Sequence, residues 1–539
     1  MDFVFGTMAT PELRLLHHRI ARTGVQHTGR ILPYDPLPGE AVMVKVVVGQ
    51  DVAATHAACY YTTDGSVPEG QRGHAVRGDV LMLERVGTEW DTPTMSYATL
   101  WQGTLPAQPE GTLVRYRIGA WSDGKEEAFA DYPDQKPTTE RAASAFFQGL
   151  PMPDLPPIGS AQGQIFNYGV DRFETPAWAK TTIMYHIFVD RFYPGDGKSW
   201  NNAQNVSDFY GGTLWGVRDK LDYIEALGAD SIWLSPIFPS NTHHGYDATD
   251  YAHVEPRMGG DEALHALVDA AHQRGIRVIL DLAANHLSHE HPYFQDALHN
   301  ADSPYRQWFT FDDSPEGYET FFGVRSMPII NLKNEGARNW MLETAQYWLR
   351  EFKIDGFRLD HANGPNPNFW TYFRAACREV NPECYLFGEV VEAPDILRTY
   401  VGRLDGLLDF YLEVALRQAY GWGTLSEPEL ETFLAHHSAY FPPDLIMPSF
   451  LDNHDLDRFL FIVNGDKEKL RRAVATQMKL PNPPIIYYGT EVGLSQNSSH
   501  AEGIGLEESR LPMLWGEAQD KELLAFYKQQ IKARRQAGL

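Results

Sequence analysis

The pattern of hydrophobic and polar residues changes at about residue 181. After that point, short apolar runs alternate with segments that repeat apolar residues every three or four positions, the spacing of one helix face. The apolar runs predict eight strands, at residues 183–189, 231–237, 276–282, 356–360, 385–390, 406–411, 445–452 and 484–489. Because these runs are continuous rather than alternating, they are typical of a parallel sheet covered on both faces.

Eight strands with helical segments between them predict an α/β fold, a (β/α)8 TIM barrel over residues 181–539. The predicted helices include residues 214–228, 261–275, 337–352 and 466–480. The connection after the third strand, at about 287–335, is long enough to fold as a small inserted subdomain.

The first 150 residues have a different pattern. Short β-rich segments such as VMVKVVVGQ and LVRYRIGAWSDG are separated by turn residues, which predicts an N-terminal immunoglobulin-like β-sandwich over residues 1–150. The stretch GLPMPDLPPIGSAQGQ is rich in proline and glycine, and it predicts a linker over residues 151–180.

Polar residues gather where the predicted barrel strands end, and barrel enzymes carry their active sites at that rim. These residues are Asp281, Asn285 and His286 after the third strand, Asp360 after the fourth, Glu389 after the fifth, and Asp452, His454 and Asp455 after the seventh. The segment HHGYD, residues 243–247, follows the second strand. The sequence therefore predicts a site made by several strand ends.

Arg358 and Asp360 interrupt an apolar strand and lie on one face of it, because side chains two positions apart point the same way. Burying them unpaired would cost several kcal/mol or more. Either they pair with each other in a structural role, or chemistry requires them. Since carboxylates at other strand ends point at the same rim, we favour chemistry. Two close carboxyls can cleave a glycosidic bond, one as nucleophile and one as proton donor.

Composition narrows the choice of ligand. The chain has 539 residues and a net charge of −25, which disfavours binding to nucleic acid or to an anionic membrane. Aromatic residues make up 12% of it, which suits a neutral sugar. Its three cysteines form no metal or disulfide pattern, and it has no apolar run of about 20 residues. Without a recognisable signal peptide, we expect a cytoplasmic protein.

Several motifs, in this order, resemble those of the α-amylase family, glycoside hydrolase family 13. They are HGYDATDY (244–251), DLAANH (281–286), GFRLDHAN (356–363), FGEV (387–390), FLDNHD (450–455) and YYGTEVG (487–493). The resemblance implies that Asp360 is the nucleophile, Glu389 the acid/base and Asp455 the stabiliser of the distorted sugar. It also implies substrate binding by Tyr246, His244, Asn285, His286, Arg358 and His454, with Asp281 as support.

The sandwich followed by a barrel is most similar to the neopullulanase, cyclomaltodextrinase and maltogenic amylase branch. This resemblance implies a carbohydrate-binding type of N-terminal domain, a homodimer formed through it, and an α-glucan substrate. The sequence departs from the branch at His361 and Gly364, where a valine and a glutamate are usual. The family's C-terminal β-domain has no counterpart after the last predicted helix, so we expect exposed apolar surface and self-association.

The loop RFYPGDGKSWNN (191–202), followed by FYGG (209–212), resembles a calcium loop of the family. No cofactor is required for the chemistry, but the resemblance implies a structural Ca²⁺ held by Asp196, Asn201 and Asn202. Pro194 and Thr213 stand where the family has an asparagine and an aspartate. An ordinary turn rich in asparagine and glycine is the alternative.

Three functions stay open at this point. The first is a retaining hydrolase of α-1,4 or α-1,6 glucosidic bonds in maltooligosaccharides, cyclodextrins, pullulan or starch. The second is a transglycosylase or isomerase acting on small α-glucosides such as trehalose or sucrose, because the same carboxylates serve both reactions. The third is an inactive sugar-binding homologue, which the presence of all three acids disfavours.

Overall fold

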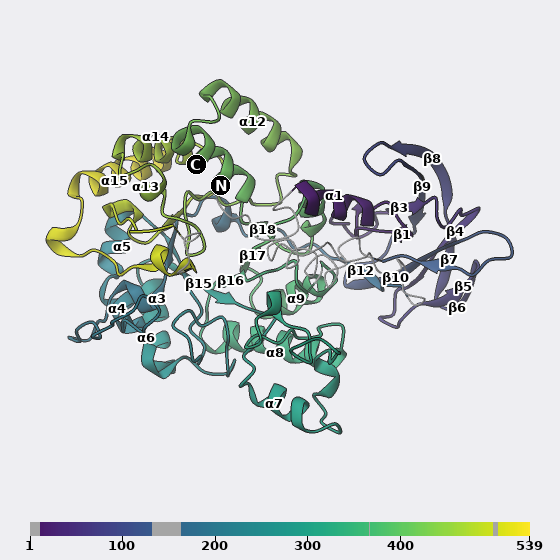
Figure 1. Ribbon diagram of the computed structural model, residues 1–539, viewed down its shortest axis with the longest axis horizontal. Coiled ribbons are helices and arrows are strands. Elements are labelled where there is room, and N and C mark those ends of the chain that lie inside the picture. The colour runs from purple at the N-terminus through teal and green to yellow at the C-terminus, as the bar shows by residue number, and fades with distance from the viewer. Residues whose placement is uncertain (1–10, 132–162, 366, 500–504) are drawn as a thin grey trace.

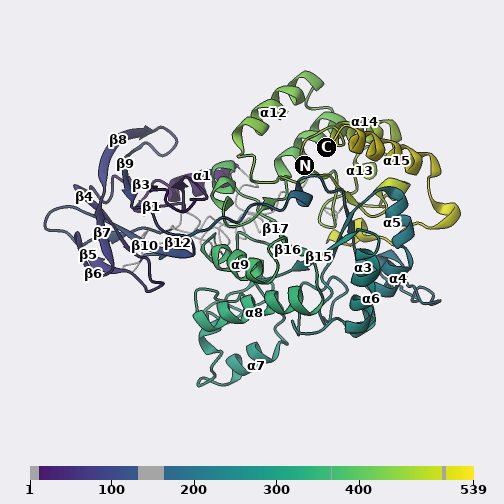
Figure 2. The same ribbon diagram turned by 180° about the vertical axis from the view of Figure 1, so that it is seen from behind.

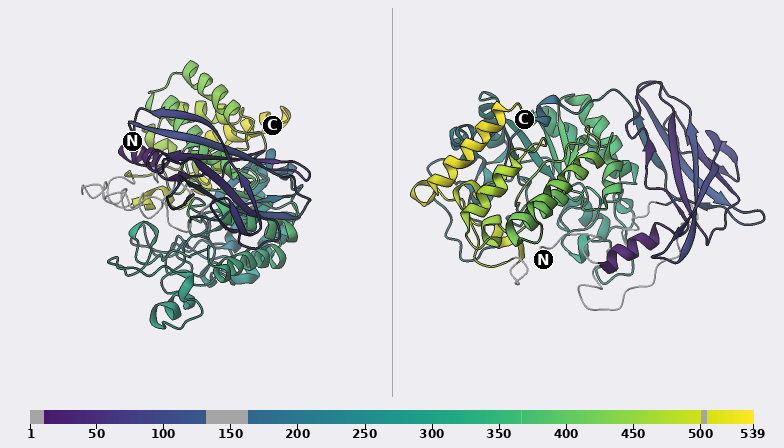
Figure 3. Two further views of the ribbon diagram at one scale, coloured as in Figure 1. Left: turned by 90° about the vertical axis from the view of Figure 1, so that its right-hand side faces the viewer. Right: turned by 90° about the horizontal axis from the view of Figure 1, so that it is seen from above.

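A computed structural model describes residues 11–131, 163–365, 367–499 and 505–539. A β-sandwich lies at one end of the elongated molecule, and the last helix, α15 (Lys521–Gln536), lies at the other end of the barrel (Figures 1 and 3). Among the described residues, no helix combines the length and apolarity that crossing a membrane requires.

The sandwich consists of two five-stranded antiparallel sheets. One has the order β1-β3-β9-β8 with β2 beside β3, the other has the order β11-β10-β4-β7 with β12 beside β10, and β5 pairs with β6. Its strands are β1 (Val25–Gln26), β2 (Ile31–Leu32), β3 (Val42–Gly49), β4 (His56–Thr62), β5 (Glu69–Gln71), β6 (His74–Arg77), β7 (Asp79–Met82), β8 (Glu84–Asp91), β9 (Ser96–Leu105), β10 (Thr112–Trp121), β11 (Ala128–Phe129) and β12 (Phe166–Val170). In β3, buried Val42, Val44 and Val46 alternate with more exposed residues, which places one face of the strand in the core.

Strand β12 corrects the predicted domain boundary. It lies within residues 151–180, which we predicted as a linker, yet it pairs antiparallel with β10. Phe166 and Tyr168 are buried, and both rings contact Tyr116. The linker prediction is therefore wrong for this strand, which continues the sandwich beyond residue 150. Residues 151–162 of that prediction lie outside the described part of the chain.

The barrel contains a parallel sheet of seven strands in the order β18-β17-β16-β15-β14-β13-β19. They are β13 (Met184–Ile187), β14 (Ser231–Leu234), β15 (Arg277–Leu282), β16 (Gly356–Leu359), β17 (Tyr385–Gly388), β18 (Gly406–Leu407) and β19 (Ile485–Tyr487).

The predicted seventh strand, 445–452, forms no regular ladder. Ile446 makes one parallel bridge to Gly406 of β18, and Ser449 makes one to Pro484, next to β19. Prolines explain the difference, because Pro448 and Pro484 have no N–H to donate to a ladder. The two bridges still connect the edge strands, so the segment closes the barrel as predicted.

Helices surround the sheet, as the alternating pattern predicted. They are α3 (Val189–Phe192), α4 (Leu214–Asp219), α5 (Leu221–Leu227), α6 (Gly260–His272), α8 (Glu335–Glu351), α9 (Pro367–Val380), α10 (Pro394–Leu397), α11 (Phe410–Leu416), α12 (Glu427–Tyr440), α13 (Phe459–Ile462), α14 (Lys467–Gln477) and α15. Helix α7 (Pro292–His299) lies in the segment inserted after β15, and α1 (Pro11–Ile20) lies beside the sandwich, where Nε2 of His18 is 2.7 Å from Oδ1 of Asp91 in β8 (Figure 1). The single helix predicted over 214–228 is interrupted at Lys220. Helix α9 contacts β12 and lies between the sandwich and the barrel strands (Figures 1 and 2).

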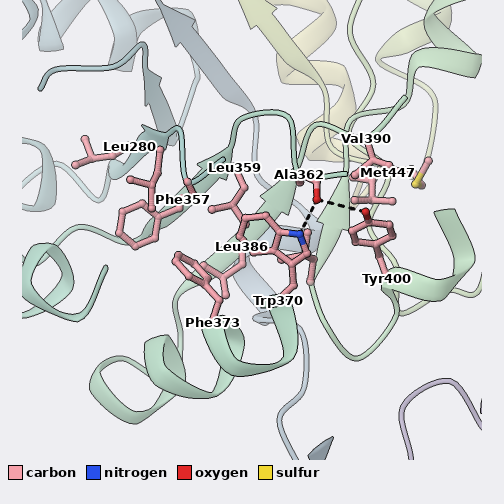
Figure 4. Close-up of a cluster of buried hydrophobic side chains, with 14 of the residues drawn as sticks. Leu280, Phe357, Leu359, Ala362, Trp370, Phe373, Leu386, Val390, Tyr400 and Met447 are labelled. Carbon is pink, nitrogen blue, oxygen red and sulfur yellow. Dashed lines mark hydrogen bonds between the residues drawn. The ribbon is translucent and has the colours of Figure 1, made fainter. Parts of the chain in front are cut away.

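Strand β16 explains how an apolar strand can end in charged residues. Phe357 and Leu359 pack outward against Trp370 and Phe373 of α9, between the sheet and the helix layer (Figure 4). The Trp370 indole N–H donates to the carbonyl of Ala362 at 2.6 Å. These contacts anchor the strand and the turn after it, while Arg358 points into the barrel.

Candidate active site

Arg358 is the centre of the site and is 0% exposed. Its Nη1 donates to Oδ1 of Asp360 and to Oδ1 of Asp281, both at 2.8 Å. Its Nη2 lies 2.9 Å from Oε2 of Glu389. These carboxylates come from the carboxyl ends of the neighbouring strands β15, β16 and β17. One guanidinium therefore holds three carboxylates together.

Asp455 follows the predicted seventh strand, and its charge raises the pKa of Asp360 and of Glu389. Its Oδ2 lies 3.0 Å from Nε2 of His454, and its Oδ1 accepts a hydrogen bond from Nη2 of Arg510 at 3.0 Å. Arg510 also donates through Nε to the His454 carbonyl at 2.8 Å and is almost completely buried. A second arginine therefore fixes the third predicted acid.

Tyr246 connects the two arginine-centred groups. Its hydroxyl donates to Oδ2 of Asp281 at 3.0 Å and lies 2.6 Å from Nε2 of His454. Its ring stacks on His454 with an interplanar angle of 9° and also packs against His244. The structure therefore gives Tyr246 a packing and bonding role in the site, and its predicted stacking on a sugar stays a prediction.

Burial keeps two histidines of the site, His454 and His244, in the neutral form. Burial lowers the pKa of His454 well below its ordinary value of 6.5, and Arg510 and Arg358 add to this effect. Burial also lowers the pKa of His244 to about 3. Nδ1 of His244 accepts the Tyr246 backbone N–H at 3.2 Å, which leaves its Nε2 to carry the proton. Neutral imidazoles can donate to or accept from sugar hydroxyls without adding charge.

Burial has the opposite effect on the carboxylates. It raises the pKa of Glu389, with Arg358 lowering it and Asp455 raising it. Burial raises the pKa of Asp360 and of Asp281 to about 7 in each case, again against the effect of Arg358. Because these groups interact strongly, a proton retained at neutral pH belongs to the cluster as a whole. The site can therefore hold both an ionised carboxylate and a proton donor.

Asp281 and Asp452 have mainly structural partners. Besides Arg358 and Tyr246, Asp281 accepts the indole N–H of Trp233 at 3.0 Å. Asp452 accepts the backbone N–H of Phe459 at 2.9 Å and the hydroxyl of Thr490. Both are fully engaged within the fold, which agrees with a supporting role for Asp281.

The inserted segment forms one wall of the site. It returns to the barrel through an antiparallel bridge between His286 and Ile329. Asn285 is also buried, and its backbone carbonyl accepts a hydrogen bond of 2.9 Å from the N–H of Ile330. Phe321 stacks on the His286 ring with centroids 4.5 Å apart and meets the His361 ring edge-on. The insertion thereby covers the residues that follow β15 and β16.

The predicted calcium loop is closed by hydrogen bonds. The Thr213 hydroxyl donates to the Pro194 carbonyl at 2.7 Å, so the two departures from the family pattern bond to each other. Oδ1 of Asn202 accepts from the Gln204 side chain, and the Asn201 amide donates to a loop carbonyl. Asp196 is exposed. Across the described ranges, no group of three or more His, Cys, Asp or Glu side chains could hold a metal.

Sequence reasoning did not identify Arg510 or Phe321. Arg510 lies 55 residues beyond Asp455 in a loop that matches none of the quoted motifs. Phe321 lies within the insertion, where the sequence has no strand-end pattern. No local signal in the sequence marks either residue, because only the closed barrel brings them to the site.

A (β/α)8 barrel with a buried carboxylate–arginine cluster at its carboxyl rim defines the class of this protein. The family described as "Alpha amylase, catalytic domain" matches residues 186–534. The chain therefore belongs to the alpha-amylase family.

Named relatives agree with this family. The chain is 44% identical over 369 residues to "Alpha-amylase 2" from Dictyoglomus thermophilum, covering 68% of this chain and 65% of that protein. It is 36% identical over 384 residues to a cyclomaltodextrinase from Bacillus sp, covering 68% and 67%. The match thus spans about two thirds of the length of these relatives. A solved cyclomaltodextrinase structure has a TM-score of 0.64 at 27% identity and covers 95% of this chain and 84% of that one.

Proposed function

We propose that the chain is a retaining glycoside hydrolase that cleaves α-glucosidic bonds in maltooligosaccharides, cyclodextrins or pullulan. The observation that carries this proposal is the placement of Asp360 and Glu389 on the two terminal nitrogens of the Arg358 guanidinium. Retaining enzymes need two carboxyl groups close together, and one rigid guanidinium keeps them so. The names of the relatives, an alpha-amylase and a cyclomaltodextrinase, support this substrate class.

In the first step, a carboxylate oxygen of Asp360 attacks the anomeric carbon. The bond from that carbon to the glycosidic oxygen breaks, and the leaving oxygen takes the proton of the Glu389 carboxyl. Arg358 keeps Asp360 aimed, and burial favours the protonated form of Glu389. The product of this step is a glycosyl ester at Asp360.

In the second step, the Glu389 carboxylate removes a proton from water. The oxygen of that water bonds to the anomeric carbon, and the ester bond to Asp360 breaks, which restores both carboxyl groups. Asp455, held by Arg510, lies where it can bind sugar hydroxyls as the ring flattens. A sugar hydroxyl in place of water would give transglycosylation, so the acids alone do not separate these reactions.

The test uses two measurements on the same protein. Asp360→Asn should lower turnover of maltotriose by about 10³-fold or more while oligosaccharide still binds. The matched control is Asp313→Asn, an exposed aspartate in the insertion, which should leave turnover unchanged. Full activity of Asp360→Asn would refute the nucleophile assignment. Chromatography of products from maltotriose, β-cyclodextrin, pullulan and sucrose would separate hydrolysis from transfer.

We also propose that calcium is dispensable for the loop at 191–213. Its own hydrogen bonds, from Thr213 to Pro194 and from two loop amides to the buried Asp190, already connect its ends. Dimer formation through the sandwich and a cytoplasmic location stay predictions.

A further inference from the structure

A cavity of about 230 Å³ lies where the sandwich meets the barrel. On the sandwich side it is lined by Arg115 of β10 and by Asn167 of β12. On the barrel side it is lined by Lys333, just before α8, by Arg338 in the first turn of α8 and by Tyr372 of α9, among others. It shares no residue with the active site.

The charge of this cavity is opposite to that of the whole molecule. The chain has a net charge of −25, yet three cationic side chains and no aspartate or glutamate line the cavity. Within the described residues, neither Arg115, Lys333 nor Arg338 forms an ion pair with a carboxylate. Three unpaired cations close together repel one another, so a bound anion would stabilise them.

The walls of the cavity are fixed by contacts within and between the domains. Nη1 of Arg115 donates to the Gly65 carbonyl at 2.9 Å, and the Arg338 guanidinium lies 4.6 Å from the Tyr372 ring centroid. Asn167 binds Asn368 twice, through its backbone N–H and its side-chain amide, both at 3.1 Å. The two guanidinium groups are therefore held in place before any ligand binds, which lowers the entropy cost of binding.

We propose that this cavity binds a small phosphate-bearing molecule, such as a phosphorylated monosaccharide. Guanidinium groups match the geometry and charge of a phosphate, and a lysine ammonium adds a further donor. At about 30 Å³ per water molecule the cavity holds about eight waters, more than a lone phosphate displaces. Asn167 also lines the cavity, and its Oδ1 accepts no hydrogen bond from the described residues, so it can accept one from a sugar hydroxyl. This proposal does not depend on the proposed hydrolase activity.

The experiment is calorimetric titration of the full chain with glucose 6-phosphate, inorganic phosphate and glucose, at constant ionic strength set with chloride. We expect saturable binding of glucose 6-phosphate, weaker binding of inorganic phosphate and no binding of glucose. Lys333→Gln and Arg338→Gln should each weaken glucose 6-phosphate binding about tenfold or more, the value of one charge-assisted hydrogen bond. Lys198→Gln, an exposed lysine in the barrel, is the matched control and should not change it.

Lys333 is exposed, so its variant should fold, and an unchanged thermal midpoint would verify this. Absence of saturable binding up to about 10 mM ligand would overturn the proposal, as would equal affinity in both variants. Glucose binding as tightly as its phosphate would instead indicate a neutral sugar site and would also overturn it. Maltotriose hydrolysis by the variants is measured separately, so failure here is distinguishable from failure of the hydrolase assignment.

Discussion

At the residue scale, Arg358 determines the electrostatics of the site. Four carboxylates, those of Asp281, Asp360, Glu389 and Asp455, share the site with the two arginines 358 and 510. Fully ionised, the cluster would carry four negative charges against two positive ones. A buried excess of negative charge favours retention of a proton, which acid catalysis requires. The arginine in an apolar strand thus permits several acids to share a small volume.

The bonds of Arg510 predict a positioning role that can be measured. Arg510→Gln removes the hydrogen bond to Asp455, so Asp455 is less well placed when the sugar distorts. We expect kcat to fall by about 10- to 100-fold while KM changes little, because the interaction matters most in the transition state. Arg510→Lys should recover part of the loss. Steady-state kinetics on maltotriose checks this, with the exposed Arg172→Gln as control.

A merely structural role for Arg510 would give a different result. The thermal midpoint would then fall, and kcat and KM would change together or not at all. A variant with normal kcat would contradict the positioning role.

The buried His27 should make the free energy of unfolding of the sandwich depend on pH. It is buried between the Lys45 carbonyl and the Tyr116 hydroxyl, and burial lowers its pKa from 6.5 to about 4. Below pH 6.5 the unfolded chain therefore binds a proton at His27 that the folded chain does not bind. The free energy of unfolding should decrease as pH falls from 6.5 to 4, by about 3 kcal/mol from this residue alone.

Urea unfolding between pH 4 and pH 7.5 measures this dependence. His27→Gln should reduce the slope within that window, although it also lowers stability at all pH values by disturbing buried hydrogen bonds. His56→Gln, an exposed histidine of the same domain, serves as control. An unchanged slope in His27→Gln would show that other groups cause the acid sensitivity.

At the element scale, the sequence correctly predicted those strands and helices whose hydrophobic pattern lies within a single segment. The continuous apolar runs at β14 and β15 and the amphipathic pattern of α6 and α8 are confirmed. Two of the predicted elements were wrong, and each error has a physical cause. Prolines reduce the predicted seventh strand to single bridges, and β12 follows a stretch rich in proline and glycine that suggested a linker.

The active site likewise contains some residues that a local motif predicts and others that only the folded chain brings together. Residues at strand ends, such as Asp360 and Glu389, follow a local motif, and the structure brings them to one guanidinium. Arg510 and Phe321 reach the site from loops far away in sequence, so their contribution depends on tertiary structure alone. The distances between carboxylates likewise follow from strand register, which no single segment specifies.

The hydrogen bonds of the loop at 191–213 lead us to expect that the loop is stable without calcium. Thr213 caps α4 by accepting the Gly216 N–H at 3.1 Å, and it donates to Pro194. Thr213→Val removes both bonds and should lower the free energy of unfolding by about 1–2 kcal/mol, whereas Thr213→Ser should retain most of it. Differential scanning calorimetry of the unmodified protein should show the same midpoint with EDTA and with Ca²⁺. A midpoint lowered by EDTA and restored by Ca²⁺ would show that calcium holds the loop.

At the scale of the whole molecule, the two domains form a continuous structure. Besides the Asn167–Asn368 pair, Arg403 of the barrel donates to the Asn167 carbonyl at 3.1 Å. Arg374 of α9 donates to the Phe173 carbonyl, just after β12. Helix α9 therefore contacts β12 on one side and the strand that carries Asp360 on the other, so the sandwich supports the element behind the proposed nucleophile.

The exposed edge of the sandwich predicts self-association. Strand β8 pairs only with β9, so its other edge is unpaired in the described structure. Trp90 and Tyr97 face each other across this hairpin, 49% and 54% exposed, and Val86 and Met95 are at least half exposed as well. Such a patch on an acidic protein should bind a second copy more readily when salt screens the charge repulsion.

We expect sedimentation velocity to show a dimer fraction that increases with protein and salt concentration. Trp90→Ser should reduce it, whereas Trp422→Ser on the barrel should not, and a monomer under all conditions would contradict the prediction.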